Sequence, residues 1–216
     1  MAEKTPSKAK AHTVYKNAQG KRVIGVTTVL SLLEKPAIHH WIANVTREGY
    51  DWTKYRDDKG TIGSLAHAMI LADLKGEETD TSEYSNLQIE QAENSFLSWL
   101  EWRKGKDIKP MLLETPLVSE QYQFGGTPDF LGHLNDDVVL MDYKTGGIYQ
   151  EAYLQACGYR ELLIENNYSP PEKAIILGIP RTEDENFKEV TYTNFKTGWE
   201  IFKRLNEVYQ LLKELK

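Results

Sequence analysis

Two apolar, strand-like segments on either side of a polar turn constrain the fold more than any other feature of the chain. Residues 127–134 and 138–145 flank the turn Asn135-Asp136, and two glycines follow the second segment. Apolar runs separated by such a turn predict an antiparallel hairpin. Further strand-like runs at 111–119, 173–179 and 188–193 predict that this half of the chain builds a sheet.

The rest of the chain has helical spacing. The pattern predicts helices over 37–74, with breaks near Gly49 and Gly60, and over 86–104, 151–165 and 198–216. In the second of these, the side chains expected to point inward are Ile89, Phe96, Leu97, Trp99 and Leu100. In the last, the apolar side carries Ile201, Leu205, Val208, Leu211, Leu212 and Leu215.

This order of elements predicts one α/β domain over residues 12–216. We expect a mixed central β-sheet flanked by helices, with a helical N-terminal portion. Residues 1–11 are rich in lysine, serine and proline and are expected to form a disordered N-terminal tail.

Composition excludes several classes of protein. The single cysteine, Cys157, rules out an internal disulfide framework, a cysteine-based zinc site and a four-cysteine iron–sulfur cluster. No apolar run approaches the roughly 18 residues of a membrane helix, and no secretory signal is visible, so the sequence predicts a soluble, intracellular protein. The net charge of −6 speaks against a large nucleic-acid footprint without excluding one.

The predicted hairpin brings two acidic residues together. Centred between Asn135 and Asp136, it places Asp129 opposite Asp142, with Cβ atoms about 4.5–5.5 Å apart. Lys144 lies two residues after Asp142 and therefore on the same face. Directly opposed carboxylates repel each other, so the arrangement calls for a bound cation, provided that no bulge or one-residue slip shifts the register.

Two carboxylates and a lysine at one point suit metal-assisted hydrolysis of a phosphodiester. The carboxylates would hold a divalent cation, and Lys144 would orient the attacking water or neutralise the charge of the transition state. The alternative is structural: Asp129 is a turn residue after Pro128, and Asp142 and Lys144 belong to a solvated strand end.

These residues resemble the signature of the PD-(D/E)XK nuclease superfamily. The segments Gly126-Thr-Pro-Asp129, Met141-Asp142-Tyr-Lys144-Thr-Gly146 and Gln155-Ala-Cys-Gly-Tyr159 are similar to its RecB-like, phage-type exonuclease branch. The resemblance implies a restriction-endonuclease-like core, and the single cysteine fits the members without an iron–sulfur cluster.

The resemblance also implies roles for individual residues. The metal ligands for one or two Mg²⁺ or Mn²⁺ ions would be His67, Asp129, Asp142 and the backbone carbonyl of Tyr143. The catalytic residues would be Asp129, Asp142 and Lys144. The substrate would be bound by Gln155 and Tyr159. On the residues alone, a packed core histidine is the more common interpretation of His67, and an ordinary helix face is that of the Gln155–Tyr159 pair. Glu114 is either an acid next to the ligands or an exposed strand residue.

The function implied is metal-dependent DNA exonuclease activity at single- or double-stranded DNA ends, in phage or bacterial recombination, repair or processing. An endonuclease or structure-specific resolvase on the same core is an alternative, and a non-catalytic DNA-end-binding module is another. No phosphate-binding helicase motif is present, so any unwinding would come from a recombination or helicase partner. No membrane partner is expected, the oligomeric state stays open, and the implied location is the cytoplasm of a bacterium or a phage-infected host.

A basic and aromatic segment precedes His67. Lys54, Arg56 and Lys59, together with Arg47, predict a rim that contacts phosphate, and Trp52 and Tyr55 lie between them, where they could stack on an unpaired base. A solvated helix face over aromatic core residues is the alternative.

Overall fold

The fold is built on a five-stranded mixed sheet. The computed structural model describes residues 13–34 and 36–215, so the predicted disordered tail lies outside the described residues. In spatial order the strands are β2 (Ile108–Leu113), β5 (Phe130–Leu134), β6 (Asp137–Lys144), β7 (Lys173–Gly178) and β8 (Lys188–Tyr192). Strands β6 and β7 are parallel and the other neighbours antiparallel. A smaller sheet contains β1 (Ile24–Gly25), β4 (Phe124–Gly126) and β3 (Leu117–Ser119).

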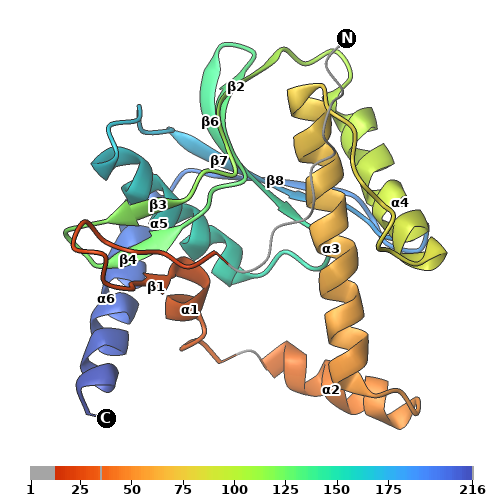
Figure 1. Ribbon diagram of the computed structural model, residues 1–216, viewed down its shortest axis with the longest axis horizontal. Coiled ribbons are helices and arrows are strands. Elements are labelled where there is room, and N and C mark those ends of the chain that lie inside the picture. The colour runs from red at the N-terminus through yellow and green to blue at the C-terminus, as the bar shows by residue number, and fades with distance from the viewer. Residues whose placement is uncertain (1–12, 35, 216) are drawn as a thin grey trace.

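Helices cover the central sheet on both faces. The helices of the described chain are α1 (Val26–Leu30), α2 (Pro36–Arg47), α3 (Trp52–Lys75), α4 (Asn86–Arg103), α5 (Gln150–Glu165) and α6 (Phe195–Glu214), of which α2 lies away from the sheet. Helices α3 and α4 lie on one side of the sheet, and α1, α5 and α6 lie on the other (Figure 1). The predicted α/β class, a mixed sheet flanked by helices with a helical N-terminal portion, is confirmed.

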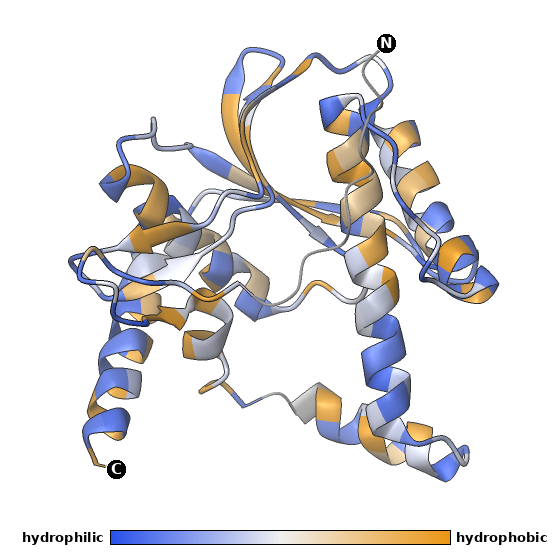
Figure 2. Cartoon of the chain, viewed as in Figure 1, coloured by the Kyte–Doolittle hydropathy of each residue, from blue (hydrophilic) through white to orange (hydrophobic). Residues whose placement is uncertain are grey.

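Alternation along β6 explains the two hydrophobic cores. Val139, Met141 and Tyr143 pack with residues of α3 and α4, whereas Leu140 packs with residues of α5 and α6. A strand buried on both faces is apolar along much of its length, and orange accordingly runs through strands in the middle of Figure 2.

The hairpin has the predicted register. Strands β5 and β6 pair from Phe130 opposite Met141 to Leu134 opposite Asp137, and Asn135 takes a left-handed turn conformation with φ of +55°. The ladder stops one residue before Asp129 and Asp142, so these two residues flank the last pair rather than belonging to it.

Three details of the sequence-based prediction are wrong. Helix α3 continues through Gly60, because one glycine weakens a helix by only about 0.5–1 kcal/mol and does not have to end it. Leu97 is 61% exposed, since the inward face of α4 is set by Trp99 and Trp102. Helix α6 begins at Phe195, and most of its predicted apolar side is exposed: Ile201, Val208, Leu211, Leu212 and Leu215.

The buried face of α6 is a different one. It carries Phe195, Gly198, Phe202 and Asn206, and the amide of Asn206 donates to the Tyr122 carbonyl over 2.9 Å. The helix therefore has a second apolar side that the described part of the chain leaves in solvent. Within residues 13–34 and 36–215, no helix has the length and hydropathy needed to cross a bilayer.

Candidate functional site

The candidate site lies at the end of β6 and the start of β5, where α3 and α5 both approach the sheet. Asp129 directly precedes β5, and Asp142 and Lys144 stand two residues apart on β6, on the face toward α5. Helix α3 supplies His67 from the opposite face, and α5 supplies Gln155. The fold thus brings together residues that are far apart in the sequence.

Asp129 is held by two contacts. Its Oδ2 accepts a hydrogen bond from the backbone N–H of Tyr143 over 2.9 Å, and its Oδ1 lies 3.6 Å from Nδ1 of His67. The other ring nitrogen of His67 is 2.9 Å from the Tyr143 carbonyl oxygen. The imidazole therefore sits between the carboxylate of Asp129 and the backbone of β6, in contact with another predicted ligand, the Tyr143 carbonyl.

Glu114 joins this pair directly. It follows β2 with φ of +38°, and its backbone N–H donates to the Asp129 carbonyl over 3.1 Å. Among the described residues, single ligand atoms of His67, Glu114 and Asp129 all lie within 4.8 Å of one another. Ligands on opposite sides of an octahedral Mg²⁺ are about 4.2 Å apart, so small side-chain adjustments would let this group hold one divalent cation.

Asp142 is turned toward Lys144 and lies outside that group of three. It is 2% exposed, and its Oδ2 lies 2.7 Å from the Lys144 ammonium, although no well-aligned hydrogen bond reaches this oxygen. Imidazole and carboxylate donors suit Mn²⁺ as well as Mg²⁺.

The two predicted substrate-binding residues form a chain that ends on Lys144. The Lys144 ammonium donates to Oε1 of Gln155 over 2.9 Å, and Nε2 of Gln155 donates to the Tyr159 hydroxyl over 2.7 Å. The i, i+4 spacing on α5 places both side chains on one face, as predicted. Their polar groups thus hold the lysine between Asp142 and α5.

Burial and charge shift the pKa values of these groups. Burial alone lowers the pKa of His67, but the adjacent Asp129 carboxylate outweighs it and raises the pKa above its usual value. Burial raises the pKa of Asp142, with a further contribution from Asp129, although Lys144 opposes it. Burial lowers the pKa of Lys144, and the two aspartates more than compensate, so the net shift is upward. One lysine and a histidine that can bind a proton therefore offset part of the negative charge at this point.

The N-terminal segment contributes a contact that the sequence did not indicate. The hydroxyl of Tyr15 lies 3.0 Å from the hydroxyl of Thr127, two residues before Asp129. A Cβ on Gly125 would approach the Tyr15 ring to 2.4 Å, and one on Gly126 would approach the Tyr159 ring to 2.7 Å. The glycine pair ahead of Pro128 was the available signal for this close approach.

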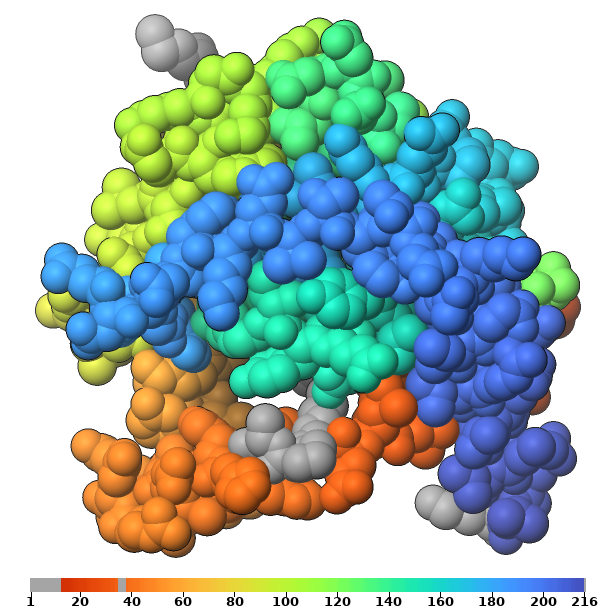
Figure 3. Space-filling view, turned by 180° about the vertical axis from the view of Figure 1, so that it is seen from behind, coloured from red at the N-terminus to blue at the C-terminus, as the bar shows by residue number. Residues whose placement is uncertain are grey.

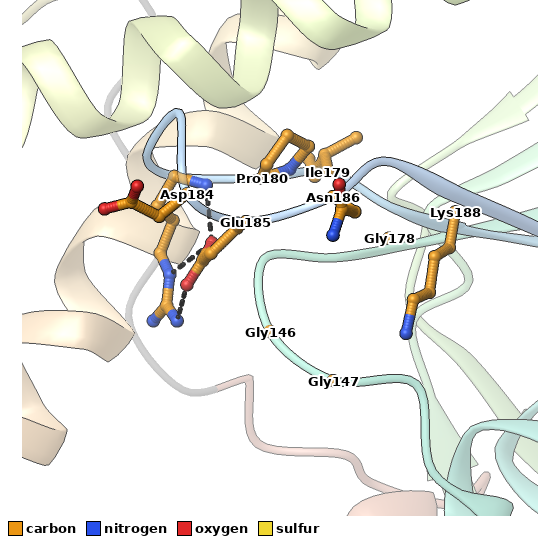
Figure 4. A pocket seen from close by; sticks show the side chains of 10 residues that line it. Gly146, Gly147, Gly178, Ile179, Pro180, Asp184, Glu185, Asn186 and Lys188 are labelled. Carbon is orange, nitrogen blue, oxygen red and sulfur yellow. Dashed lines mark hydrogen bonds and ion pairs between the residues drawn. The ribbon is translucent and has the colours of Figure 1, made fainter.

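A small cavity adjoins the site. It has a volume of about 250 Å³ and lies between the turn after β6, at Gly146 and Gly147, and the loop that leads from β7 to β8 (Figure 4). Ile179 in that loop donates its N–H to the Lys144 carbonyl over 2.8 Å, which joins the loop to the backbone at the end of β6. Its lining includes Lys188 and the ion pair of Arg181 with Glu185, at 2.6 Å.

No protein-family model matches the sequence, and no curated protein sequence is similar to it. Solved structures that are similar include a Eubacterium rectale protein, provisionally assigned as an exonuclease, with 9% identity, a TM-score of 0.41 and 68% of each chain covered. An alkaline exonuclease from Laribacter hongkongensis has 14% identity and a TM-score of 0.37, with 89% of this chain and 92% of that chain covered. Its complex with dAMP gives a TM-score of 0.32 and 14% identity over 69% of this chain and 82% of that chain. Because these TM-scores are below 0.5, the similarity does not indicate a function for this chain. The function is therefore inferred from the residues of the site.

Proposed function

We propose that this protein is a divalent-metal-dependent DNA nuclease of the PD-(D/E)XK superfamily that hydrolyses phosphodiester bonds at DNA ends. The proposal rests on one observation, that three potential metal ligands and an ion pair lie next to one another. His67, Glu114 and Asp129 bring ligand atoms within 4.8 Å of one another, next to an Asp142–Lys144 ion pair of 2.7 Å. The sequence motif resembles that superfamily at these same aspartates and this lysine.

The metal would be held by His67, Glu114 and Asp129, with Asp142 and the Tyr143 carbonyl adjoining. A bound Mg²⁺ or Mn²⁺ would supply a Lewis acid for a phosphoryl oxygen and would lower the pKa of a water molecule. From the sequence, Glu114 was either an acid next to the metal ligands or an exposed strand residue. In this proposal it is itself a metal ligand. The like charge of three carboxylates in a largely buried site is a further reason to expect a cation.

The residues of the chain itself would hold and neutralise the substrate. The Lys144 ammonium, fixed by Asp142 and Gln155, offers its remaining donor to a phosphoryl oxygen or an attacking water. A fixed ammonium stabilises charge that develops in the transition state without having to reorganise. Gln155 and Tyr159 would act mainly through the lysine, because their polar groups already bond to it and to each other.

Exonuclease action in phage or bacterial recombination or repair, with a partner supplying any unwinding, is part of the same proposal and rests on the motif. The test uses linear duplex and single-stranded DNA with an end label, and a closed circle, each with Mg²⁺, Mn²⁺ or EDTA. Wild type is compared with Lys144→Ala and Asp142→Asn. Matched controls are Lys104→Ala and Asp107→Asn, which change exposed, ion-paired side chains.

Metal-dependent loss of linear DNA that spares the circle, and that disappears in the two site variants alone, is the expected result. Cutting of the circle would reassign the protein to the endonucleases or resolvases. If folded wild type cleaves nothing with either metal but binds DNA ends, the proposal fails, and a binding module takes its place.

A further inference from the structure

Helix α3 extends well beyond the body of the protein. Every buried residue of this helix lies at Ile62 or later, and of residues 38–61 only Val45 is buried. We call residues 38–61, which belong to α2, the connecting turn and the first part of α3, the arm. Figure 1 shows the arm projecting away from the sheet, and Figure 3 shows it standing beyond α5 when the molecule is viewed from behind.

The arm carries four large aromatic side chains that belong to neither hydrophobic core. These are Trp41, Tyr50, Trp52 and Tyr55. The rings of Trp41 and Tyr50 each lie 5.8 Å from the ring of Tyr55, and Tyr50 is 57% exposed. Trp41, Trp52 and Tyr55 are half-buried outside the two cores, so each still offers part of its ring to a ligand.

Cationic groups lie over and between these rings. The guanidinium of Arg56 is 5.3 Å from the Trp52 ring centre, and the ammonium of Lys59 is 5.3 Å from that of Tyr55. Lys54 is also exposed, but it leaves α3 about 200° around the axis from Trp52, on the opposite side of the helix. Rings for stacking interleaved with cations for phosphate are the composition of a single-strand-binding surface.

Three of the four acids of the arm are engaged within the protein, and the fourth, Glu48, is exposed. Asp51 caps α3 by accepting from the backbone N–H of Thr53 over 2.9 Å, and Asp58 accepts from Gln88 over 2.6 Å. Asp57 pairs with Arg56 at 2.7 Å, which leaves Arg47, Lys54 and Lys59 as the cations of the arm without an acidic partner among the described residues.

The arm and the candidate metal group share one helix. Arg56 precedes His67 by eleven residues, a rise of about 17 Å and a rotation within about 20° of whole turns, so both side chains leave α3 in nearly the same direction. Trp52 lies one turn further out, about 22 Å from His67 along the axis. A flexible ligand bound along this face would reach the site.

We propose that the arm binds the unpaired, single-stranded part of a DNA end by stacking its bases on Trp52 and Tyr50, with Arg56, which lies beside Trp52 on the same face, contacting phosphate. The inference rests on the proposed function for the identity of the ligand as DNA. Duplex DNA offers stacked and paired bases, which such rings cannot reach, so the arm selects ends with unpaired bases.

The test measures the binding of fluorescent 12-nucleotide single-stranded DNA and of a blunt-ended hairpin by anisotropy in EDTA, where no cleavage occurs. Trp52→Ala and Tyr50→Ala should each weaken single-strand binding at least about fivefold, with little effect on the hairpin. Trp52→Phe, which keeps a ring, should restore most of the affinity. Tyr209→Ala, on α6, is the aromatic control, and unfolding temperatures verify that each variant is folded.

Single-strand affinity equal to wild type in both alanine variants, or an equal loss for the blunt hairpin, would overturn the inference. Undetectable single-strand binding by folded wild type would overturn it as well. Hydrolysis of thymidine 5′-(p-nitrophenyl phosphate) by wild type, a substrate too small to reach the arm, tests the site separately. If wild type hydrolyses neither this substrate nor DNA, the proposed function is contradicted. The binding measurements on the arm are not affected by that outcome.

Discussion

The backbone N–H of Tyr143 donates to Oδ2 of Asp129 over 2.9 Å, one residue beyond the last pair of the β5–β6 ladder. A side chain thus continues the sheet where the backbone pairing stops. The same carboxylate faces His67 through its other oxygen. Stability and the candidate chemistry therefore depend on one residue.

Asp129→Ala should lower the free energy of unfolding by about 1–3 kcal/mol, because it leaves the buried Tyr143 N–H without its acceptor. Asp129→Asn should cost less, since an amide oxygen can accept the same bond. Urea unfolding at pH 7 measures both, with Asp136→Ala in the exposed turn as control. Equal stability of Asp129→Ala and wild type would contradict this role.

Gly63 sets the distance between α3 and the turn that follows Lys144. A Cβ at Gly63 would lie 2.7 Å from Oγ1 of Thr145, whereas one at Gly60 would meet nothing within 4 Å. Gly63→Ala should therefore displace the turn and reduce kcat, and Thr145→Ala in the same chain should restore part of it. Gly60→Ala should instead stabilise the protein by about 0.5–1 kcal/mol. Thermal unfolding and DNA cleavage are measured on wild type, the two single glycine variants and the double variant. Equal stability and equal kcat of Gly63→Ala and Gly60→Ala would contradict this role of Gly63.

The local parts of the site could be predicted from the sequence. The turn at Asn135 and the alternation along both strands fix the register, which places Lys144 on the same face as Asp142. The i, i+4 spacing brought Gln155 and Tyr159 together for the same reason. Each of these relations depends only on neighbours within one hairpin or one helix.

The remaining relations depend on packing between distant segments. Glu114 reaches His67 because β2 pairs with β5 through an irregular register near Pro110, and the chain then turns with a positive φ. Helix α6 has two candidate apolar sides, and the one that packs includes the polar Asn206 because a carbonyl from another segment accepts its amide. Periodicity alone does not say which side another element will cover.

Gln155 should affect turnover more than substrate binding. Gln155→Ala removes an acceptor from the Lys144 ammonium, and hydrogen bonds to charged groups contribute about 1.5–3 kcal/mol, so kcat should fall by roughly 10- to 100-fold with little change in KM. Tyr159→Phe should have a smaller effect in the same direction. Steady-state cleavage of a labelled oligonucleotide separates the two constants. A rise in KM with kcat unchanged would instead favour direct contact with DNA.

Binding of Mn²⁺ alone should raise the unfolding temperature of the wild type. At a metal concentration 100 times Kd, the stabilisation is about 2.7 kcal/mol, and excess EDTA should reverse it. His67→Ala, Glu114→Gln and Asp129→Asn should each lose most of this shift, while Glu90→Gln, which changes an exposed acid on α4, should keep it. An unchanged shift in Glu114→Gln would remove Glu114 from the ligands and leave it a neighbouring acid.

Cys157 should be inert in the folded protein. It is 1% exposed, and burial raises the pKa of its thiol from 9.0 to about 11. The reactive thiolate is therefore scarce at neutral pH, and iodoacetamide should label the protein only as fast as it unfolds. Labelling in guanidinium chloride gives the rate for the accessible thiol. Rapid labelling of native protein at pH 7.5 would contradict this expectation.

The same shift predicts a loss of stability at alkaline pH. Between pH 9 and 11 the unfolded thiol has lost its proton while the folded thiol keeps it, so unfolding releases a proton and stability falls as pH rises. Two pH units correspond to about 2–3 kcal/mol for this one group. Cys157→Ala removes the group, so the free energy of unfolding should decline less steeply over this range in the variant than in wild type. Urea unfolding at pH 8, 9, 10 and 11 measures the difference, and parallel declines would show that the thiol is not its source.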